Sequence, residues 1–151
     1  MIAYTSSTPG TLSPGTASYV NKSLLLGDGT YSRKMTYVGN NSANNGRKPG
    51  STTSLTYTIT EDGDYIIVTN AHSGDNAETA TLSSSNLTSS NATSTVTLLN
   101  QTYNRSIYNT AYSSASRTSI YSITNAKAGD VLTMTSVGQY SRGSQIIVFK
   151  Y

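Results

Sequence analysis

Short segments in which apolar and hydroxyl side chains alternate are the feature that most constrains the fold of this chain. Leu55, Tyr57 and Ile59 are separated by single threonines, so every second side chain is apolar. A period of two places these side chains on one face of a β-strand, whereas a helix needs a period of 3.6 residues. Because the sequence shows no convincing helical window, the pattern predicts strands.

Further strand signals recur along the chain, separated by turns rich in Gly, Asp and Asn. Spacings of about 8–12 residues between short strands are typical of β-sandwiches and barrels. The predicted strands cover residues 24–26, 31–38, 55–59, 65–68, 77–82, 95–99, 118–124, 131–137 and 146–149. Residues 83–94, almost entirely Ser, Thr and Asn, fit either an exposed loop or a strand of weak register.

Turn residues divide the chain into three predicted parts. Residues 1–23 are rich in Ser, Thr, Gly and Pro and predict an extended N-terminal arm with little core of its own. Residues 24–50 predict a hairpin, paired across an Asp-Gly turn, and a Gly/Asn-rich loop over residues 39–50. Residues 51–151 carry the strongest strand signals and predict the β-sandwich itself.

Composition narrows the class of protein. The 151 residues suffice for one domain with a real core, and the absence of cysteine excludes disulfides and thiolate metal sites. Only 11% of the residues are charged, against about 25% in an average globular protein. Disordered chains are charge-rich and poor in aromatics, so the 12 tyrosines and the β-branched runs predict a folded protein.

Charge and hydropathy also limit the expected partners. The formal charge of +3 comes from scattered basic residues in runs no longer than two, whereas a nucleic-acid surface needs them clustered. No apolar stretch approaches the ~20 residues of a membrane span, and the first residues lack the basic and apolar regions of a signal peptide. We therefore expect no nucleic acid, no membrane insertion and synthesis in a cytoplasm.

Few residues in the sequence are suited to catalysis, and we expect no enzyme, no cofactor and no metal. His72 is the only histidine, and a metal site would need partners at suitable spacing. Most of the seven acidic residues flank turn glycines, where Asp is favoured for conformational reasons. Two alternatives stay open: a Ca²⁺ site in the turn of residues 61–64, and a glycan hydrolase using a carboxylate pair such as Asp64 and Asp130.

The tyrosines give the best indication of a recognition surface. Tyr joins apolar area to a polar tip at low entropy cost, and with Ser, Gly and Asn it is favoured in binding surfaces. Residues 103–112 have that composition, and packing in a subunit interface is an equally good explanation of it. The predicted ligand-binding residues are Tyr103, Tyr108, Tyr112, Asn104 and Asn109.

Three motifs in the last hundred residues resemble the jelly roll of the tumour necrosis factor and complement globular-head family. Residues 61–68 (EDGDYIIV) are similar to the family's Gly-x-Tyr followed by an apolar strand. Residues 120–132 (IYSITNAKAGDVL) are similar to its two apolar strands joined by Gly-Asp, and residues 143–151 (GSQIIVFKY) to its C-terminal strand. The resemblance implies a jelly-roll β-sandwich and a compact trimer. The sequence departs from the animal members in lacking tryptophan and a collagen or membrane stalk.

The same architecture occurs in bacteriophage fibres, decoration proteins and receptor-binding tips, and the cysteine-free, Ser/Thr/Asn/Gly/Tyr-rich composition resembles such virion proteins. We therefore expect a non-enzymatic virion structural protein, namely a capsid decoration, head fibre or tail component. It would form a homotrimer and bind other virion proteins through the N-terminal arm. The alternative is a carbohydrate- or receptor-binding tip, or an extracellular adhesin or filament subunit, with a glycan as its partner.

Overall fold

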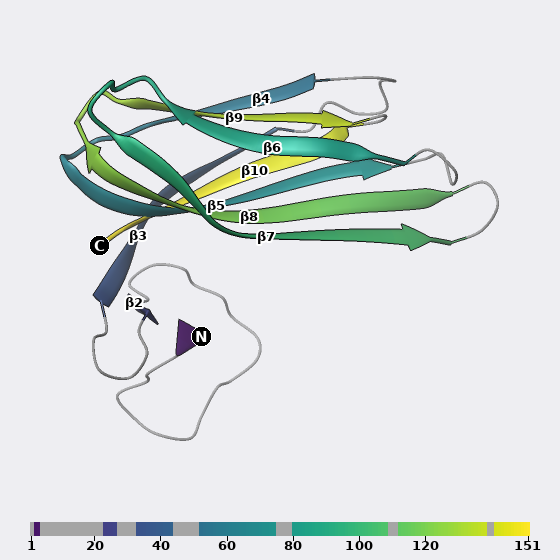
Figure 1. Cartoon of the computed structure of the whole chain (residues 1–151), viewed down its shortest axis with the longest axis horizontal. Coiled ribbons are helices and arrows are strands. Elements are labelled where there is room, and N and C mark those ends of the chain that lie inside the picture. The colour runs from purple at the N-terminus through teal and green to yellow at the C-terminus, as the bar shows by residue number, and fades with distance from the viewer. Residues whose placement is uncertain are drawn as a thin grey trace.

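A computed structural model of the chain describes residues 2–3, 23–26, 33–43, 52–74, 80–108, 112–138 and 141–151. All regular structure in these residues is β-strand, and the strands form two antiparallel sheets (Figure 1). The strands are β1 (Ile2–Ala3), β2 (Ser23–Leu26), β3 (Arg33–Ala43), β4 (Thr52–Thr58), β5 (Gly63–Gly74), β6 (Leu82–Ser89), β7 (Thr95–Ile107), β8 (Ser113–Ala126), β9 (Val131–Gly138) and β10 (Ser141–Lys150). The prediction of an all-β protein is confirmed.

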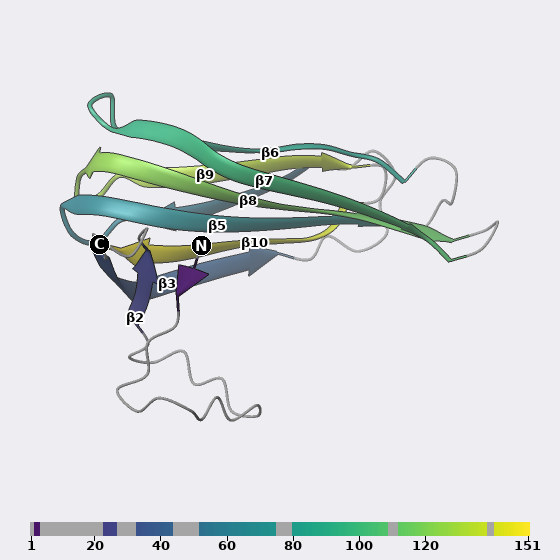
Figure 2. The same ribbon diagram turned by 60° about the horizontal axis from the view of Figure 1, so that its bottom comes forward.

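The large sheet has seven strands in the order β1-β2-β3-β10-β5-β8-β7, and the small sheet has three in the order β4-β9-β6. The small sheet lies over one face of the large sheet, as the two views in Figures 1 and 2 show. Because successive side chains of a strand point to opposite faces, each sheet contributes every second residue to the space between them. Leu55 and Met134 of the small sheet meet Ile67, Ile123 and Val148 of the large sheet in one core cluster.

Large apolar side chains of the core are concentrated at one end of the sandwich. Near the start of β5, Tyr65, Ile67, Ile123, Leu132 and Met134 are almost fully buried. Burying each of these side chains stabilises the fold by about 1.5–3 kcal/mol relative to leaving it exposed to water. We call this the apolar end.

Toward the end of β5, the buried residues on the inner faces are mostly small or carry hydroxyls. The buried hydroxyl side chains are Thr53, Thr69, Ser73, Ser85, Ser113, Ser119, Ser136 and Ser144. The Ser136 and Ser144 hydroxyls lie 3.0 Å apart across the two sheets. The Ser85 hydroxyl lies 3.1 Å from that of Ser119, and Gln101 Nε2 donates to Ser119 Oγ at 2.8 Å. We call this region the hydroxyl end; in these contacts buried hydroxyl groups satisfy one another, as buried polar groups require.

Several predicted boundaries are wrong because the ladders continue through polar sequence. β3 extends to Ala43, so residues 39–43 are strand where a loop was predicted; they pair with residues 144–148 of β10. Ser73 and Gly74 belong to β5 and not to a turn. Residues 80 and 81 are outside any strand, and β6 begins only at Leu82. Residues 39–43, 73 and 74 are strand because their main chain pairs with a neighbouring strand, and this pairing outweighs their low strand propensity.

The N-terminal part of the chain adds strands to one edge of the large sheet. β2 pairs antiparallel with β3, with Leu24 opposite Met35, as the predicted hairpin requires. β1 pairs with β2. The predicted arm over residues 1–23 falls largely outside the described residues, as do the predicted turn at residues 27–30 and the rest of the loop at residues 44–50. No helix among the described residues is long and apolar enough to cross a membrane.

Candidate functional site

Strand β7 is the edge of the large sheet opposite β1, and it pairs with β8 alone. Figure 1 shows it running along the margin of the sandwich, with β6 as the nearest strand of the small sheet. Almost every side chain of β7 is exposed; Val96, near its start, packs against the core. The narrow small sheet therefore leaves most of this strand uncovered.

Part of the uncovered surface of β7 is apolar. Leu98, Tyr103 and Ile107 pair with Tyr121, Arg117 and Ser113 of β8. Paired residues share a face of the sheet, and Tyr121 and Ser113 are buried between the two sheets, so these three β7 side chains point to the inner side. They are nevertheless exposed, Ile107 to 63%. We call Leu98, Tyr103 and Ile107 the β7 inner face.

Tyr103 is held in place by Arg117. The Arg117 guanidinium lies 5.1 Å from the centre of the Tyr103 ring, within the range of a cation–π contact. The same guanidinium donates to Gln101 Oε1 at 2.6 Å and to the Leu82 carbonyl at 3.0 Å. Arg117 thus joins β8 to β6 and β7 and directs its charge toward the inner side of the large sheet.

Tyr108 and Tyr112 close the hairpin between β7 and β8. The Tyr108 N–H donates to the Tyr112 carbonyl at 2.9 Å, and the Tyr108 hydroxyl lies 3.3 Å from Ser114 Oγ. Both rings remain exposed, Tyr108 to 72% and Tyr112 to 52%. They form a pair of aromatic side chains at the end of the sandwich, which we call the tyrosine tip.

The predicted ligand-binding residues therefore lie in three places. Tyr108 and Tyr112 are together at the tip, and Tyr103 is on the β7 inner face. Asn104 pairs with Ser116 and points to the opposite face of the sheet from Tyr103. Asn109 lies outside the described residues. The structure does not bring the four described residues to one surface, and the role of all five in binding stays a prediction.

An open pocket that the sequence did not indicate lies on the outer face of the large sheet. Its volume is about 440 Å³, and two or three consecutive residues from each of four neighbouring strands line it. The lining residues are Ser42, Ala43, Asn70, Ala71, His72, Ser116, Arg117, Thr118, Gly143, Ser144 and Gln145. We call it the outer pocket.

The register of the strands explains how the outer pocket is built. Ser144 pairs with both Ala43 and Ala71, and Ala71 pairs with Arg117. The buried side chains of Ala71 and Ser144 point into the sandwich, so the backbone of this row forms the floor of the pocket. The neighbouring residues on each strand alternate to the outer side and form its walls. Finding this site from sequence would have required the pairing of β3, β10, β5 and β8.

Hydrogen bonds join three of the outward side chains. Thr118 Oγ1 donates to Asn70 Oδ1 at 2.8 Å, and Asn70 Nδ2 donates to Gln145 Oε1 at 3.3 Å. These bonds fix the orientation of both amides. Since each amide has two N–H donors, the Gln145 amide group can still donate to a ligand.

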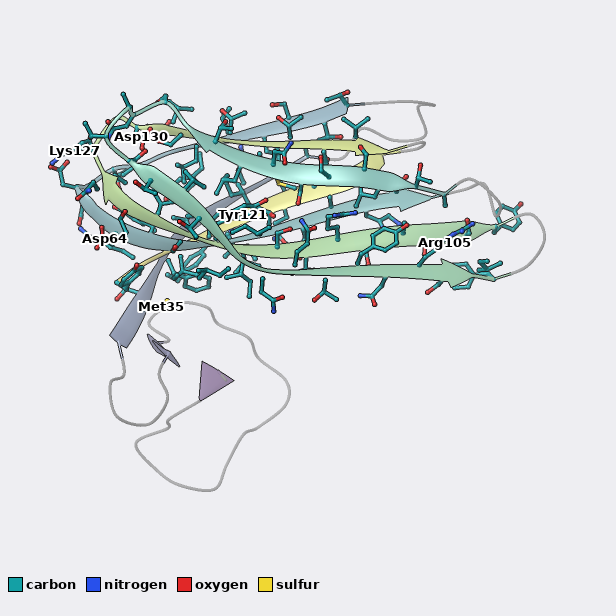
Figure 3. All side chains as sticks on the ribbon, viewed as in Figure 1. Met35, Asp64, Arg105, Tyr121, Lys127 and Asp130 are labelled. Carbon is teal, nitrogen blue, oxygen red and sulfur yellow. The ribbon has the colours of Figure 1, made fainter. Side chains whose placement is uncertain are left out.

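The carboxylates considered for catalysis support turns at the apolar end. Asp130 is buried and accepts hydrogen bonds from the hydroxyls of Ser89 and Ser90 and from the Asn91 N–H at 2.7–2.9 Å. Asp64 Oδ1 accepts from the Asn125 N–H at 3.0 Å. Figure 3 shows Asp64, Lys127 and Asp130 at the same end of the molecule, away from Arg105. The Asp130 contacts hold the connection between β6 and β7 against that between β8 and β9, and the Asp64 bond joins the start of β5 to the end of β8.

The other two carboxylates of the same end bind lysines. Glu61 pairs with Lys150 at 2.6 Å and Asp62 with Lys127 at 2.8 Å. The hydrogen bond from Lys150 lowers the pKa of Glu61 below its usual value. The bonds from Lys127 and from the Ala128 N–H lower the pKa of Asp62 in the same way. The carboxylates that could have held Ca²⁺ are thus engaged by protein donors, and the described residues contain no group of three metal-ligating side chains.

Comparison with protein-family models, with curated proteins and with solved structures finds no match to this chain. Three surfaces of the described residues are the candidates for function: the β7 inner face, the tyrosine tip and the outer pocket.

Proposed function

We propose that the chain is a non-enzymatic structural protein of a virion, built on a jelly-roll sandwich and working as a trimer. The jelly roll is supported by the way the chain passes between the sheets. Strands β3, β5, β8 and β10 lie in the large sheet, and β4, β6 and β9 lie in the small one. Most sequence neighbours therefore face each other across the core, which is typical of a jelly roll. Among the described strands, β7 departs from this pattern by pairing with β8 in the large sheet, and β1 and β2 extend the same sheet beyond β3.

The exposed β7 inner face is the observation that supports assembly into an oligomer. A long edge strand with exposed apolar side chains favours association with another chain, and monomeric proteins usually place charges or Pro on such edges. β7 has 13 residues and contains only one charged residue, Arg105. Covering Leu98, Tyr103 and Ile107 would remove apolar area from water, which stabilises a complex.

A second apolar surface, on the outer face of the large sheet, is the proposed contact for the β7 inner face of a neighbouring copy. Val68 pairs with Ile147 on the outer face of the large sheet, and Phe149 lies farther along β10, its ring 6.0 Å from that of Tyr37. These side chains are half-buried within the single chain. Because the β7 inner face and this outer patch are different surfaces, contact between them is heterologous, and such contacts give a ring where the rotation between copies closes and a filament where it does not. The closed form that we propose is a ring of three copies.

The assembly is tested by placing a charge on the β7 inner face. Ile107→Asp buries a carboxylate in the proposed interface and should convert a trimer into a monomer in size-exclusion chromatography with light scattering. The matched control is Asn104→Asp, which adds the same charge to the outer face of the same strand and should leave the mass unchanged. A trimer that survives Ile107→Asp would show that β7 is not the interface.

Mass spectrometry of purified virus particles tests whether the chain is a virion component. If the chain is a virion component, it should remain with capsid or tail proteins through density-gradient purification. We propose that residues 1–23, which are rich in Ser, Thr, Gly and Pro, make this attachment. Deletion of these residues should release the protein from particles without changing its oligomeric state. Recovery of the intact chain only from the culture medium would favour an extracellular adhesin or filament subunit.

The tyrosine tip supports a second function, that of a receptor- or carbohydrate-binding tip. Tyr108 and Tyr112 expose their rings together at one end of the sandwich, where a glycan could stack on them. Alanine at both positions should abolish binding on a glycan array. Thr60→Ala, an exposed substitution at the opposite end, should have no effect. An array that is negative for the unmodified protein would exclude this function of the tip.

A further inference from the structure

We propose that the outer pocket is a binding site for a neutral sugar. The site is separate from the β7 inner face and from the tyrosine tip, and it adjoins the outer patch, since Asn70 and Gln145 lie two residues along β5 and β10 from Val68 and Ile147. Its volume of about 440 Å³ lies within the roughly 300–1,000 Å³ of small-molecule sites. Four strands of one sheet hold its walls, which gives the side chains fixed positions.

The chemistry of the lining favours hydroxyl groups as ligands. The outward side chains are amides, hydroxyls and one imidazole: Asn70, Gln145, Ser42, Ser116, Thr118 and His72. Amides and hydroxyls offer both donors and acceptors, and each sugar hydroxyl also does both. The hydrogen bonds from Thr118 to Asn70 and from Asn70 to Gln145 orient the two amides before a ligand arrives. Such preorganisation reduces the entropy lost on binding.

The charge of the lining favours a neutral ligand over an ionic one. Among the described residues that line the pocket there is no carboxylate and no lysine. The one guanidinium among the lining residues belongs to Arg117, whose bonds to Gln101 and Leu82 and contact with Tyr103 place it toward the inner side of the sheet. An anionic ligand would therefore lose its hydration without gaining an opposite charge.

Gly143 keeps the pocket open. Gly143 pairs with His72, and Ser144 beside it points inward, so a side chain at position 143 would point into the pocket. Among the described residues, a Cβ added there would meet the Ala43 carbonyl oxygen alone, at 3.8 Å, which is an ordinary contact. A larger residue can therefore occupy the pocket without distorting the sheet, and this gives a specific test.

The experiment is saturation-transfer NMR of the full chain with glucose, galactose, mannose and N-acetylglucosamine, each tested alone. A site made of a few hydrogen bonds predicts a dissociation constant on the order of 1 mM for at least one of them. Gly143→Leu should abolish the signal. Thr97→Leu is the matched control, because it adds the same side chain to an exposed residue of the same sheet outside the pocket. The control should bind as the unmodified protein does.

A second variant keeps the test valid if Gly143→Leu does not fold. Asn70→Ala removes the central amide and should weaken binding about five- to tenfold, as loss of one or two hydrogen bonds does. The proposal is overturned if none of the four sugars binds, or if a folded Gly143→Leu protein binds them unchanged. It is also overturned if N-acetylneuraminic acid, an anionic sugar tested in parallel, binds more tightly than all four.

Discussion

The two ends of the sandwich are built from different side chains. At the apolar end, large residues such as Tyr65, Ile67 and Leu132 fill the space between the sheets, and carboxylates fasten the turns. At the hydroxyl end the interior residues are mostly Ser, Thr and Ala. The outer pocket and the tyrosine tip both lie at the hydroxyl end, since the pocket lies where the end of β5 pairs with the start of β8, and the tip connects the end of β7 to the start of β8.

Because of this difference, the apolar end mainly provides stability, and the hydroxyl end holds the surfaces proposed for recognition. Burial of apolar area scales with side-chain size, so the apolar end contributes most of the free energy of folding. Buried hydroxyl pairs contribute little net stability because they replace bonds to water, but they fix where the strands lie. The hydroxyl end therefore supplies a rigid frame for exposed residues, while the apolar end keeps the sandwich folded.

The largest expected effect comes from removing a large side chain at the apolar end. Ile67→Ala should lower the free energy of unfolding by about 2–5 kcal/mol, because it removes buried methyl groups and leaves a cavity. The matched change on the same strand, Ser73→Ala at the hydroxyl end, should lower it by about 1 kcal/mol. Urea denaturation of both variants measures the contrast. Equal losses would show that the two ends do not differ in this way.

A smaller loss is expected from enlarging a residue at the hydroxyl end. A Cβ at Gly138 would lie 2.7 Å from Ser73 Oγ, 2.8 Å from Ser73 Cβ and 3.2 Å from the Thr81 carbonyl oxygen. Gly138→Ala should therefore destabilise the protein by about 1–3 kcal/mol through overpacking. Adding Ser73→Gly removes the closest contact and should restore part of the loss in thermal unfolding. If the double variant loses more stability than the two single variants lose together, the close contact between position 138 and Ser73 is not the cause of the loss in Gly138→Ala.

The smallest effect concerns pH at the apolar end. The pKa values of Glu61 and Asp62 are lowered in the folded protein by their hydrogen bonds to Lys150 and Lys127. A lowered pKa contributes stability above the unfolded values of 4.5 and 3.8, and this contribution is lost as the pH falls through the folded values. Both pairs are exposed, so the change is small.

The variant with Glu61→Gln and Asp62→Asn should therefore lose less thermal stability between pH 7 and pH 3 than the unmodified protein. Replacing two carboxylates outside these pairs would serve as a poor control, because Asp64 and Asp130 hold turns. Lys127→Met with Lys150→Met is the better one, since it removes the same pairs from the other side. An unchanged pH dependence in both variants would contradict the assigned cause.

Much of the fold could be predicted from the sequence, because apolar alternation marks its most buried strands. Residues 55–58 and 65–68 are predicted and found as parts of β4 and β5. The extensions of β3 and β7 through polar residues could not be predicted, since main-chain pairing with β10 and β8 decides them. The tyrosine-rich segment was recognised from composition, but its division between the tip and the β7 inner face depends on the hairpin register.

The outer pocket was missed for the same reason. Asn70, Thr118 and Gln145 are distant in sequence and become neighbours only through the pairing of β5 with β8 and β10. No single segment carries a motif for it. The sequence indicates no role for His72, and its position in the wall of a pocket follows from the register alone.

The central claim, that this sandwich works as a trimer, is tested most directly by native mass spectrometry of the unmodified chain at micromolar concentration. The account predicts a single assembly with three times the chain mass of 16.0 kDa. A species of 16.0 kDa at every concentration, in the absence and presence of purified particles, would contradict it.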